Sequence, residues 1–289
     1  MPELPEVETI ARGLDRRVKG DVIESVWLGS KPEPLKSSAR EIMATLESKR
    51  INGVRRMGKF IVLDLEAVGR ARAPKRAKKF AQRQSDPASG KAQWIVHLGM
   101  TGRLLVSPPS EEIARHTHAI VKLASGRELR FVDPRRFGRI SEARNGDFEA
   151  GGDEPLEVAL VRFVGLFRGR KTPIKSALLN QKLLRGVGNI YADESLFRAG
   201  VRPRRRAASL TRAELGLLRS SLQEVLKEAI ALGGSSVSDY VDADGEEGFF
   251  QLQHRVYGRE GEPCLVCKTP IKRVVIAGRS SHYCPKCQK

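Results

Sequence analysis

The sequence predicts an α+β protein with three parts: an N-terminal β-sandwich with a leading helix, a helical domain, and a C-terminal β-hairpin that holds a metal ion. Three observations predict this arrangement. Short apolar runs separated by Gly, Pro and Ser fill the first half of the chain. Apolar residues at helical spacing dominate from about residue 174, and all four cysteines lie in two tight pairs near the C-terminus.

The length is compatible with this division, because 289 residues are enough for two domains and a small third. A Gly-rich, acidic stretch at Asn145–Asp153 is typical of a linker. We therefore expect domains at residues 1–144, 154–233 and 234–289.

The formal net charge of +18 points to a polyanionic partner, since lysine and arginine neutralise phosphates and release counterions. Nucleic acid is the expected partner. There are two alternatives: the chain is a ribosomal or chaperone-like basic protein, or its charge serves only solubility. No apolar run approaches the roughly 18 residues of a membrane span, and acidic residues at the N-terminus do not fit a secretory signal. We expect a cytoplasmic protein.

The first helix is predicted from Val7, Ile10, Leu14 and Val18, which recur at helical spacing before Gly20. Strands are predicted after it, with one helix between them at Ala39–Leu46. The apolar runs that predict these strands are Val22–Leu28, Phe60–Leu65, Trp94–Leu98, Ala119–Leu123 and Leu129–Val132.

Residues 70–91, between two of these strands, contain eight basic side chains and one acid, Asp86. Such a composition buries too little apolar surface to order itself. We expect a solvated loop in the free protein, and a basic arm that touches DNA is compatible with that expectation.

The helical part is predicted from apolar periodicity at Ile174–Leu184, Tyr191–Ala199 and Leu215–Ala231. Thr211 followed by Glu214 forms a capping box at the start of the last of these helices. Gly233 and Gly234 come directly after it, as expected at a helix end.

The cysteine pattern is the strongest purely physical signal. Each Cys-x2-Cys pair presents two thiolates to one tetrahedral ion, and the sixteen residues between the pairs suit a β-hairpin. The hairpin is expected to run through Lys272–Ile276, a turn at Ala277–Gly278, and Arg279–Tyr283. Four thiolates close the coordination shell, so one structural zinc ion is predicted, with iron as the weaker alternative. Its ligands are Cys264, Cys267, Cys284 and Cys287.

A second signal is the Gly-rich turn within Leu183–Glu194, which two predicted helices flank. Asn189 lies near the start of the second helix, where exposed N–H groups form a phosphate cradle. An ordinary packing joint between helices is the alternative interpretation.

A third signal is the N-terminus, which begins Met1-Pro2-Glu3. Removal of Met1 leaves the Pro2 amine free. An α-amine has a pKa of about 7.7–8.0, so roughly a third is unprotonated near pH 7.5, against about a thousandth of a lysine. Pro2 is therefore a serviceable nucleophile that gives a charged iminium with an aldehyde, and Glu3 could serve as acid or base. Many proteins without such chemistry also begin Met-Pro.

Together these features resemble the formamidopyrimidine-DNA glycosylase family of bacterial repair enzymes, and the resemblance spans nearly the whole chain. The ordered set of motifs carries it: residues 1–9 (MPELPEVET), 97–102 (HLGMTG), 133–138 (DPRRFG), 186–194 (GVGNIYADE) and 257–264 (YGREGEPC), followed by the cysteine module.

The resemblance implies that the chain is a bifunctional DNA glycosylase and abasic-site lyase. Oxidised purines in double-stranded DNA, such as 8-oxoguanine and ring-opened formamidopyrimidines, are the implied substrates. Pro2 is the implied nucleophile at C1′, Glu3 the acid and base, and Glu6 a nearby carboxylate. An iminium intermediate and β,δ-elimination then cut the strand. A helix-two-turn-helix, a zinc-finger hairpin, a monomer in the bacterial cytosol, and no catalytic metal or nucleotide cofactor are implied as well.

The resemblance also implies the DNA contacts. Lys59 matches a lysine that holds phosphates next to the lesion, Asn189 the phosphate-binding asparagine, and Arg279 the arginine of the zinc finger. Met100, Arg135 and Phe137 match the trio that enters the duplex. Flipping a base opens a void and strands its partner, so apolar wedges restore stacking and an arginine restores hydrogen bonds. Without the resemblance, Met100 and Phe137 would be read as core residues.

The 70–91 stretch is longer and more basic than the short turn expected in this family, which puts the DNA footprint in doubt. Ser235–Phe250 resembles the lesion-capping loop and favours purine substrates. Three alternatives remain: an endonuclease VIII-like enzyme for oxidised pyrimidines, a non-catalytic DNA-binding protein of the same fold, and a ribosomal or transcriptional zinc-ribbon protein.

Overall fold

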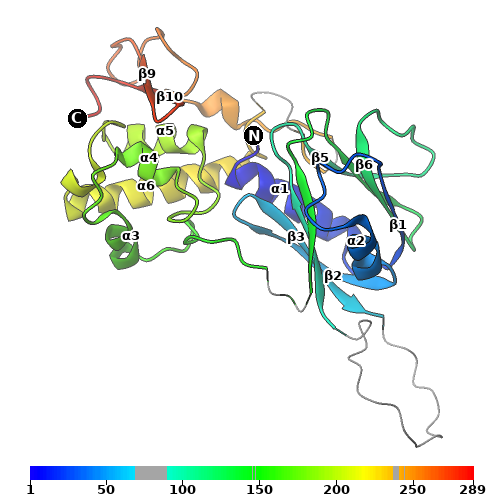
Figure 1. The fold of residues 1–289 in the computed structure, drawn as a ribbon. Coiled ribbons are helices and arrows are strands. Elements are labelled where there is room, and N and C mark those ends of the chain that lie inside the picture. The colour runs from blue at the N-terminus through cyan, green and yellow to red at the C-terminus, as the bar shows by residue number, and fades with distance from the viewer. Residues whose placement is uncertain (69–89, 145, 147, 237–240, 244) are drawn as a thin grey trace, which may run out of the picture. The chain divides into compact units, whose positions relative to one another are not determined.

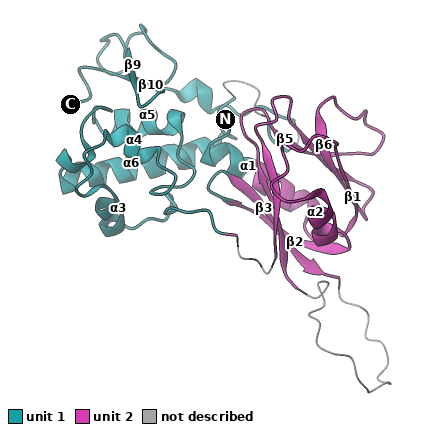
Figure 2. Ribbon diagram, viewed as in Figure 1, with its two compact units in different colours: residues 1–9, 57–59, 149–289 teal, residues 10–56, 60–148 magenta. Residues whose placement is uncertain are grey.

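The computed structural model describes the chain except for residues 69–89, 145, 147, 237–240 and 244. The basic stretch 70–91 therefore lies almost wholly outside the described residues, and Ser235–Phe250 lies partly outside them. The chain divides into two compact units (Figure 2). One comprises residues 10–56 and 60–148, and the other residues 1–9, 57–59 and 149–289. We refer to them as the β unit and the helical unit. The three domains expected at 1–144, 154–233 and 234–289 remain a proposal.

The β unit is built from two four-stranded sheets (Figure 1). The first has the order β1-β6-β7-β5 and the second β2-β3-β4-β8. The strands are β1 (Ile23–Leu28), β2 (Lys49–Met57), β3 (Phe60–Ala67), β4 (Ala92–His97), β5 (Arg103–Ser107), β6 (Thr117–Leu123), β7 (Glu128–Val132) and β8 (Arg139–Arg144).

Within each sheet, neighbouring strands pair antiparallel and place large apolar residues opposite one another. Leu63 of β3 faces Trp94 of β4, and Leu104 of β5 faces Phe131 of β7. Trp94 and Phe131 are fully buried, as expected for large side chains that fill the core of a β domain. Helix α2 (Ala39–Leu46) begins with a capping box in which Ser38 and Glu41 exchange hydrogen bonds.

All five predicted strands and both predicted helices of this region are present within one or two residues of the expected bounds. The prediction missed β2, β5 and β8. β2 and β8 have the basic or polar sequences KRINGVRRM and RISEAR, so their pairing partners and not their own apolar pattern determine them. β5 has the apolar run LLV within RLLVS, and the prediction overlooked it.

Helix α1 (Leu4–Val18) carries the predicted apolar stripe. Val7, Ile10, Leu14 and Val18 are at most 2% exposed. The division into units falls within this helix, after Thr9. Its first residue, Leu4, belongs to the apolar core of the helical unit. The N-terminal residues are therefore anchored in the helical unit.

The helical unit contains α3 (Leu160–Phe167), α4 (Ile174–Leu178), α5 (Asn189–Arg198) and α6 (Arg212–Ala231), with short 3₁₀ turns at Ala207–Ser209 and Phe250–Gln253. The Thr211–Glu214 capping box at α6 is confirmed. The sequence did not predict α3. The helix expected to reach Leu184 ends at Leu178, because the side chain of Asn180 accepts a hydrogen bond from Lys182 N and starts a turn.

The C-terminal hairpin follows the prediction residue by residue. β9 (Lys272–Ile276) pairs antiparallel with β10 (Arg279–Tyr283). The two turn residues, Ala277 and Gly278, both have positive φ, as a tight two-residue hairpin turn requires. The predicted fold class is confirmed. Within the described residues, no helix combines the length and apolarity that a membrane span requires.

Candidate active site

The N-terminal segment is held against the turn that precedes α5. Leu4 N donates to Gly186 O at 3.0 Å, and the Leu4 side chain is fully buried in the core of the helical unit. Gly186 has a φ of 87°, and a Cβ there would lie 2.9 Å from Cβ of Leu4. Glycine is needed for both the conformation and the close approach. This contact fixes the buried Pro2 and Glu3 beside the turn.

Glu3 places a buried carboxyl group at the start of α5. Its Oε1 accepts a hydrogen bond of 3.2 Å from Ile190 N, and Oε2 has no hydrogen-bond partner among the described residues. Burial raises the pKa of Glu3 to about 7, against the opposing effect of Lys59. A carboxyl group with this pKa is present in both protonation states near neutral pH, as a general acid and base must be.

Both carboxylate oxygens of Glu6 accept hydrogen bonds, whereas only one oxygen of Glu3 does. Its carboxylate accepts from Glu3 N and from Ser235 N, each at 2.8 Å, and from the Tyr191 hydroxyl. Burial raises the pKa of Glu6. These three bonds cross-link the N-terminal segment to α5 and to the residues after α6, so Glu6 orients the segment that carries Pro2 and Glu3.

Lys59 follows the tight turn at Gly58, whose φ is 62°, and is 9% exposed. Burial lowers the pKa of Lys59, the negative charge of Glu3 opposes this shift, and the positive charge of Arg279 adds to it. Lys59, Glu3 and Arg279 are thus close enough to interact electrostatically. Lys59 therefore interacts with one buried carboxyl and with one further cation.

Asn189 is the first residue of α5 and carries a second unsatisfied polar atom. Its Oδ1 is buried and has no hydrogen-bond partner among the described residues, while its side chain hydrogen-bonds the Tyr257 hydroxyl. Unpaired buried polar atoms are rare in folded proteins, and this amide oxygen can accept a hydrogen bond only from a group that donates one.

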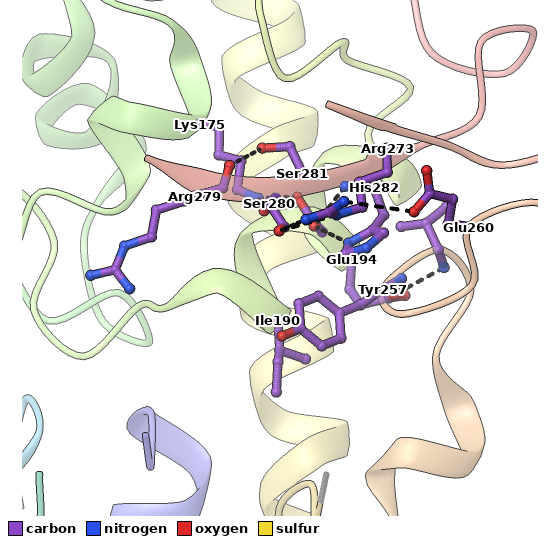
Figure 3. A network of polar contacts seen from close by, with 12 residues as sticks. Lys175, Ile190, Glu194, Tyr257, Glu260, Arg273, Arg279, Ser280, Ser281 and His282 are labelled. Atoms are coloured by element: carbon purple, nitrogen blue, oxygen red, sulfur yellow. Dashed lines mark hydrogen bonds and ion pairs between the residues drawn. The ribbon is translucent and has the colours of Figure 1, made fainter. Parts of the chain in front are cut away.

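A buried ion pair positions the strand that begins with Arg279. Lys175 Nζ lies 2.6 Å from Asp193 Oδ1 and donates to Ser280 O at 2.6 Å. Asp193 also accepts from the backbone N of His282 at 2.9 Å. The charged pair thus holds β10 on both sides of Ser281, and Figure 3 shows the Arg279 side chain extending away from this network.

Glu194, which follows Asp193 on α5, holds the segment that carries Tyr257 in place. Glu194 is fully buried and accepts from Arg255 N, Val256 N and Tyr257 N at 2.8 to 3.0 Å (Figure 3). Two consecutive carboxylates of α5 therefore fix Tyr257 and Arg279 relative to Asn189. The sequence prediction missed Lys175, Asp193 and Glu194 in this role. The one available signal is a lysine inside the apolar run of α4, which does not name its partner.

The predicted trio lies on two adjacent loops of the β unit. Gly99, with φ 65°, packs so closely on the backbone of Phe137 that a Cβ would lie 2.5 Å away. Met100 is 43% and Phe137 54% exposed, and the Arg135 guanidinium carbon lies 4.9 Å above the Phe137 ring. Exposure on this scale excludes a role in the core for Met100 and Phe137.

The four cysteines form a zinc-finger site. Their Sγ atoms all lie within 4.8 Å of one another, with Cys264 to Cys287 at 3.9 Å and Cys267 to Cys284 at 3.4 Å. A tetrahedral zinc ion with bonds of about 2.3 Å places its sulfur ligands about 3.8 Å apart, so the four thiols fit one ion. All four positions of the shell are taken by protein, and the ion is structural.

Three family models match successive parts of the chain. Residues 1–140 match the formamidopyrimidine-DNA glycosylase N-terminal domain, and residues 152–241 match its H2TH domain. Residues 261–289 match the zinc finger found in FPG and IleRS. The last match covers all four cysteines.

Individual relatives agree over their full length. The formamidopyrimidine-DNA glycosylase of Solibacter usitatus is 43% identical, and the match covers 100% of both chains. The crystal structure of the MutM (Fpg) protein of Thermus thermophilus has a TM-score of 0.82 at 41% identity and covers 99% of this chain and 98% of its own. A complex of a Lactococcus lactis Fpg variant with Fapy-dG-containing DNA has a TM-score of 0.85 at 30% identity, with full coverage of both chains. The chain belongs to the formamidopyrimidine-DNA glycosylase family.

Proposed function

We propose that this DNA glycosylase excises oxidised purines and then cuts the strand through a Schiff base on Pro2. The buried Glu3 carboxyl, with its pKa near 7 and one oxygen left without a partner, carries the proposal. A binding protein has no use for an unsatisfied buried carboxyl next to its N-terminus, because such a group destabilises the fold. Perturbed carboxyl groups of this kind are typical of catalytic acids and bases.

The chemistry starts once Met1, which is 46% exposed, is removed. The Pro2 nitrogen attacks C1′ of the damaged nucleotide, and the bond from C1′ to the base breaks. Glu3 donates a proton as the sugar ring opens, which leaves an iminium between Pro2 and the sugar. The Glu3 carboxylate takes the C2′ proton, the iminium accepts the electrons of that C–H bond, and the C3′–O bond to the 3′-phosphate breaks. Loss of the C4′ proton to water then breaks the C5′–O bond, and the 5′-phosphate leaves.

Lys59, Asn189 and Arg279 are proposed to hold the phosphates on either side of the lesion. The support is their chemistry and surroundings: Lys59 is close enough to Glu3 and to Arg279 to interact electrostatically, and Asn189 places an amide at the N-terminus of α5. Met100, Arg135 and Phe137 are proposed to fill the duplex after the base leaves, and their exposure on adjacent loops supports this role.

Oxidised purines are the proposed substrates because two complexes of related proteins contain them, while a third, of L. lactis Fpg, contains an oxidised pyrimidine. The complex of the L. lactis Fpg variant contains Fapy-dG, and a complex of MutM contains a carbocyclic 8-oxo-G. The same structures support DNA as the partner, and we propose that it is double-stranded. Neither elimination step requires a nucleotide cofactor.

The test is borohydride trapping on duplex DNA with one 8-oxoguanine opposite cytosine, with the adduct mapped by mass spectrometry. We expect a covalent adduct on Pro2 in the wild-type chain and a large loss of adduct in Glu3→Gln. Absence of an adduct, with Met1 shown to be removed and zinc bound, would refute the purine substrate. Trapping on an oxidised pyrimidine instead would indicate the endonuclease VIII-like alternative, and no trapping on either would indicate a non-catalytic binding protein.

A further inference from the structure

Three segments of the helical unit run side by side at the end that carries the C-terminus. Residues 168–173 connect α3 to α4, residues 202–206 follow α5, and residues 285–289 form the second zinc knuckle. Ala207 N donates to Thr172 O at 2.9 Å, and Pro173 pairs with Arg206 in an isolated β-bridge. Arg202 donates from its side chain to Gln288 O and Pro285 O, each at 2.8 Å. These bonds make one continuous surface.

The surface is basic and lacks compensating acids. None of the three segments contains Asp or Glu. Eight basic residues of these segments are exposed, and five of them define what we call the distal basic surface: Arg168, Lys171, Arg204, Arg206 and Lys286. An ordinary solvated surface intersperses charges of both signs. A cluster of one sign creates a local field that attracts a polyanion.

Three arginines of this surface differ from six others in the same unit. Arg162, Arg185, Arg198, Arg205, Arg259 and Arg273 each have a carboxylate within 4.0 Å. Arg168, Arg204 and Arg206 have no carboxylate at that distance among the described residues, and neither does Arg279, the proposed phosphate ligand. Arg205, between two of them, is neutralised by Glu214 at 2.5 Å. The unpaired guanidinium groups are left available for an external anion.

The distal basic surface is separate from the proposed active site. Arg279 begins β10 and Tyr283 ends it, about 13 Å away by the rise of a strand. The knuckle with Lys286 follows beyond Tyr283. Figure 1 shows the N-terminus and the C-terminus well apart within the helical unit. A phosphate bound at Arg279 therefore does not occupy the distal surface.

We propose that the distal basic surface binds the phosphate backbone of a second segment of double-stranded DNA while the first occupies the active site. The proposal rests on the proposed function in so far as DNA is the partner. Guanidinium groups recognise phosphate with paired hydrogen bonds. A protein partner would require apolar anchors, and the described residues of the three segments expose no large apolar side chain.

The experiment counts duplexes bound per chain at saturation, by sedimentation of the zinc-loaded full chain with a lesion-free duplex of about 15 base pairs, roughly 50 Å long. The test variant combines Arg168→Ser, Lys171→Ser, Arg204→Ser and Arg206→Ser. The control variant removes the same charge from exposed basic residues of the β unit by Lys31→Ser, Lys36→Ser, Arg40→Ser and Lys122→Ser. Thermal unfolding of both variants establishes that they are folded.

We expect two duplexes on the wild-type and control chains and one on the test variant. With four phosphate contacts, affinity for the second duplex should fall about 100-fold between 50 and 200 mM salt. One duplex on the wild-type chain, or two on a folded test variant, would overturn the proposal. Binding of poly-L-glutamate in place of the second duplex would overturn it in favour of an acidic protein. Borohydride trapping is scored separately, so failure of the proposed function is distinguishable from failure of this surface.

Discussion

Replacing Gly188 by alanine should remove activity through one steric contact. Gly188 precedes α5 with φ −130° and ψ −163°, an extended conformation that alanine adopts without strain. A Cβ at this position would lie 2.1 Å from Cδ and 2.4 Å from Oε1 of Glu3. Carbon atoms in ordinary contact are about 3.5–4.0 Å apart, so the Glu3 carboxyl must move by about 1 Å or more.

The expected losses of stability and of rate follow from the contacts that this movement of the Glu3 carboxyl breaks. The carboxyl group loses the 3.2 Å hydrogen bond from Ile190 N. A hydrogen bond to a charged group contributes about 1.5–3 kcal/mol, and overpacking costs about 1–3 kcal/mol. We expect the free energy of unfolding to fall by the sum of these two costs, about 2.5–6 kcal/mol. A displacement of 1 Å at a reacting group lowers the rate by about 100-fold.

The assay measures the single-turnover rate of borohydride trapping on abasic-site DNA together with the melting temperature. Gly216→Ala is the matched control, because Gly216 lies inside α6 and the nearest atom to its Cβ is Leu160 Cδ1 at 3.7 Å. The control should trap at the wild-type rate, and its free energy of unfolding should rise by about 1 kcal/mol because alanine favours a helix more than glycine does. Trapping by Gly188→Ala at the wild-type rate would refute the position assigned to the Glu3 carboxyl.

Four further outcomes are expected. Because the pKa of Glu3 is raised to about 7, the folded chain keeps a proton between about pH 4.5 and 7 that the unfolded chain has lost. The free energy of unfolding therefore falls as pH rises through this window. Melting curves at several pH values should show a smaller fall in Glu3→Gln. Lys175→Met leaves the buried Asp193 carboxylate without its lysine partner, so the melting temperature should drop and the free energy of unfolding should fall by about 3–5 kcal/mol. DNA affinity should fall with the displaced β10, and an unchanged affinity would contradict the positioning role. Cys267→Ser should release zinc, measured by elemental analysis, and abolish DNA binding, whereas full affinity without metal would contradict the role of the finger. Deleting residues 70–91 should weaken DNA binding and flatten its salt dependence, and an unchanged slope would mean that the stretch makes no phosphate contacts.

Local patterns were enough for much of the fold. The stripe of α1, the capping box of α6 and the C-terminal hairpin depend on neighbours within a few residues, and the structure places them where the sequence predicts them. Strand β8 has one buried apolar residue, Ile140, and forms because its backbone pairs with β4. A strand whose partner is distant in sequence leaves no periodic signal of its own.

The candidate site divides in the same way. The sequence by itself determined the reactive residue types: an amine and a carboxyl at the N-terminus, an asparagine at a Gly-rich turn, and four thiols at ligand spacing. Only the tertiary structure decided the protonation and the position of these groups. Glu3 has its raised pKa because a turn more than 180 residues away buries it, and Arg279 is positioned because Lys175 and Asp193 meet in the interior. Burial and ion pairing depend on distances through space, and these are set by packing between segments that are far apart in the sequence.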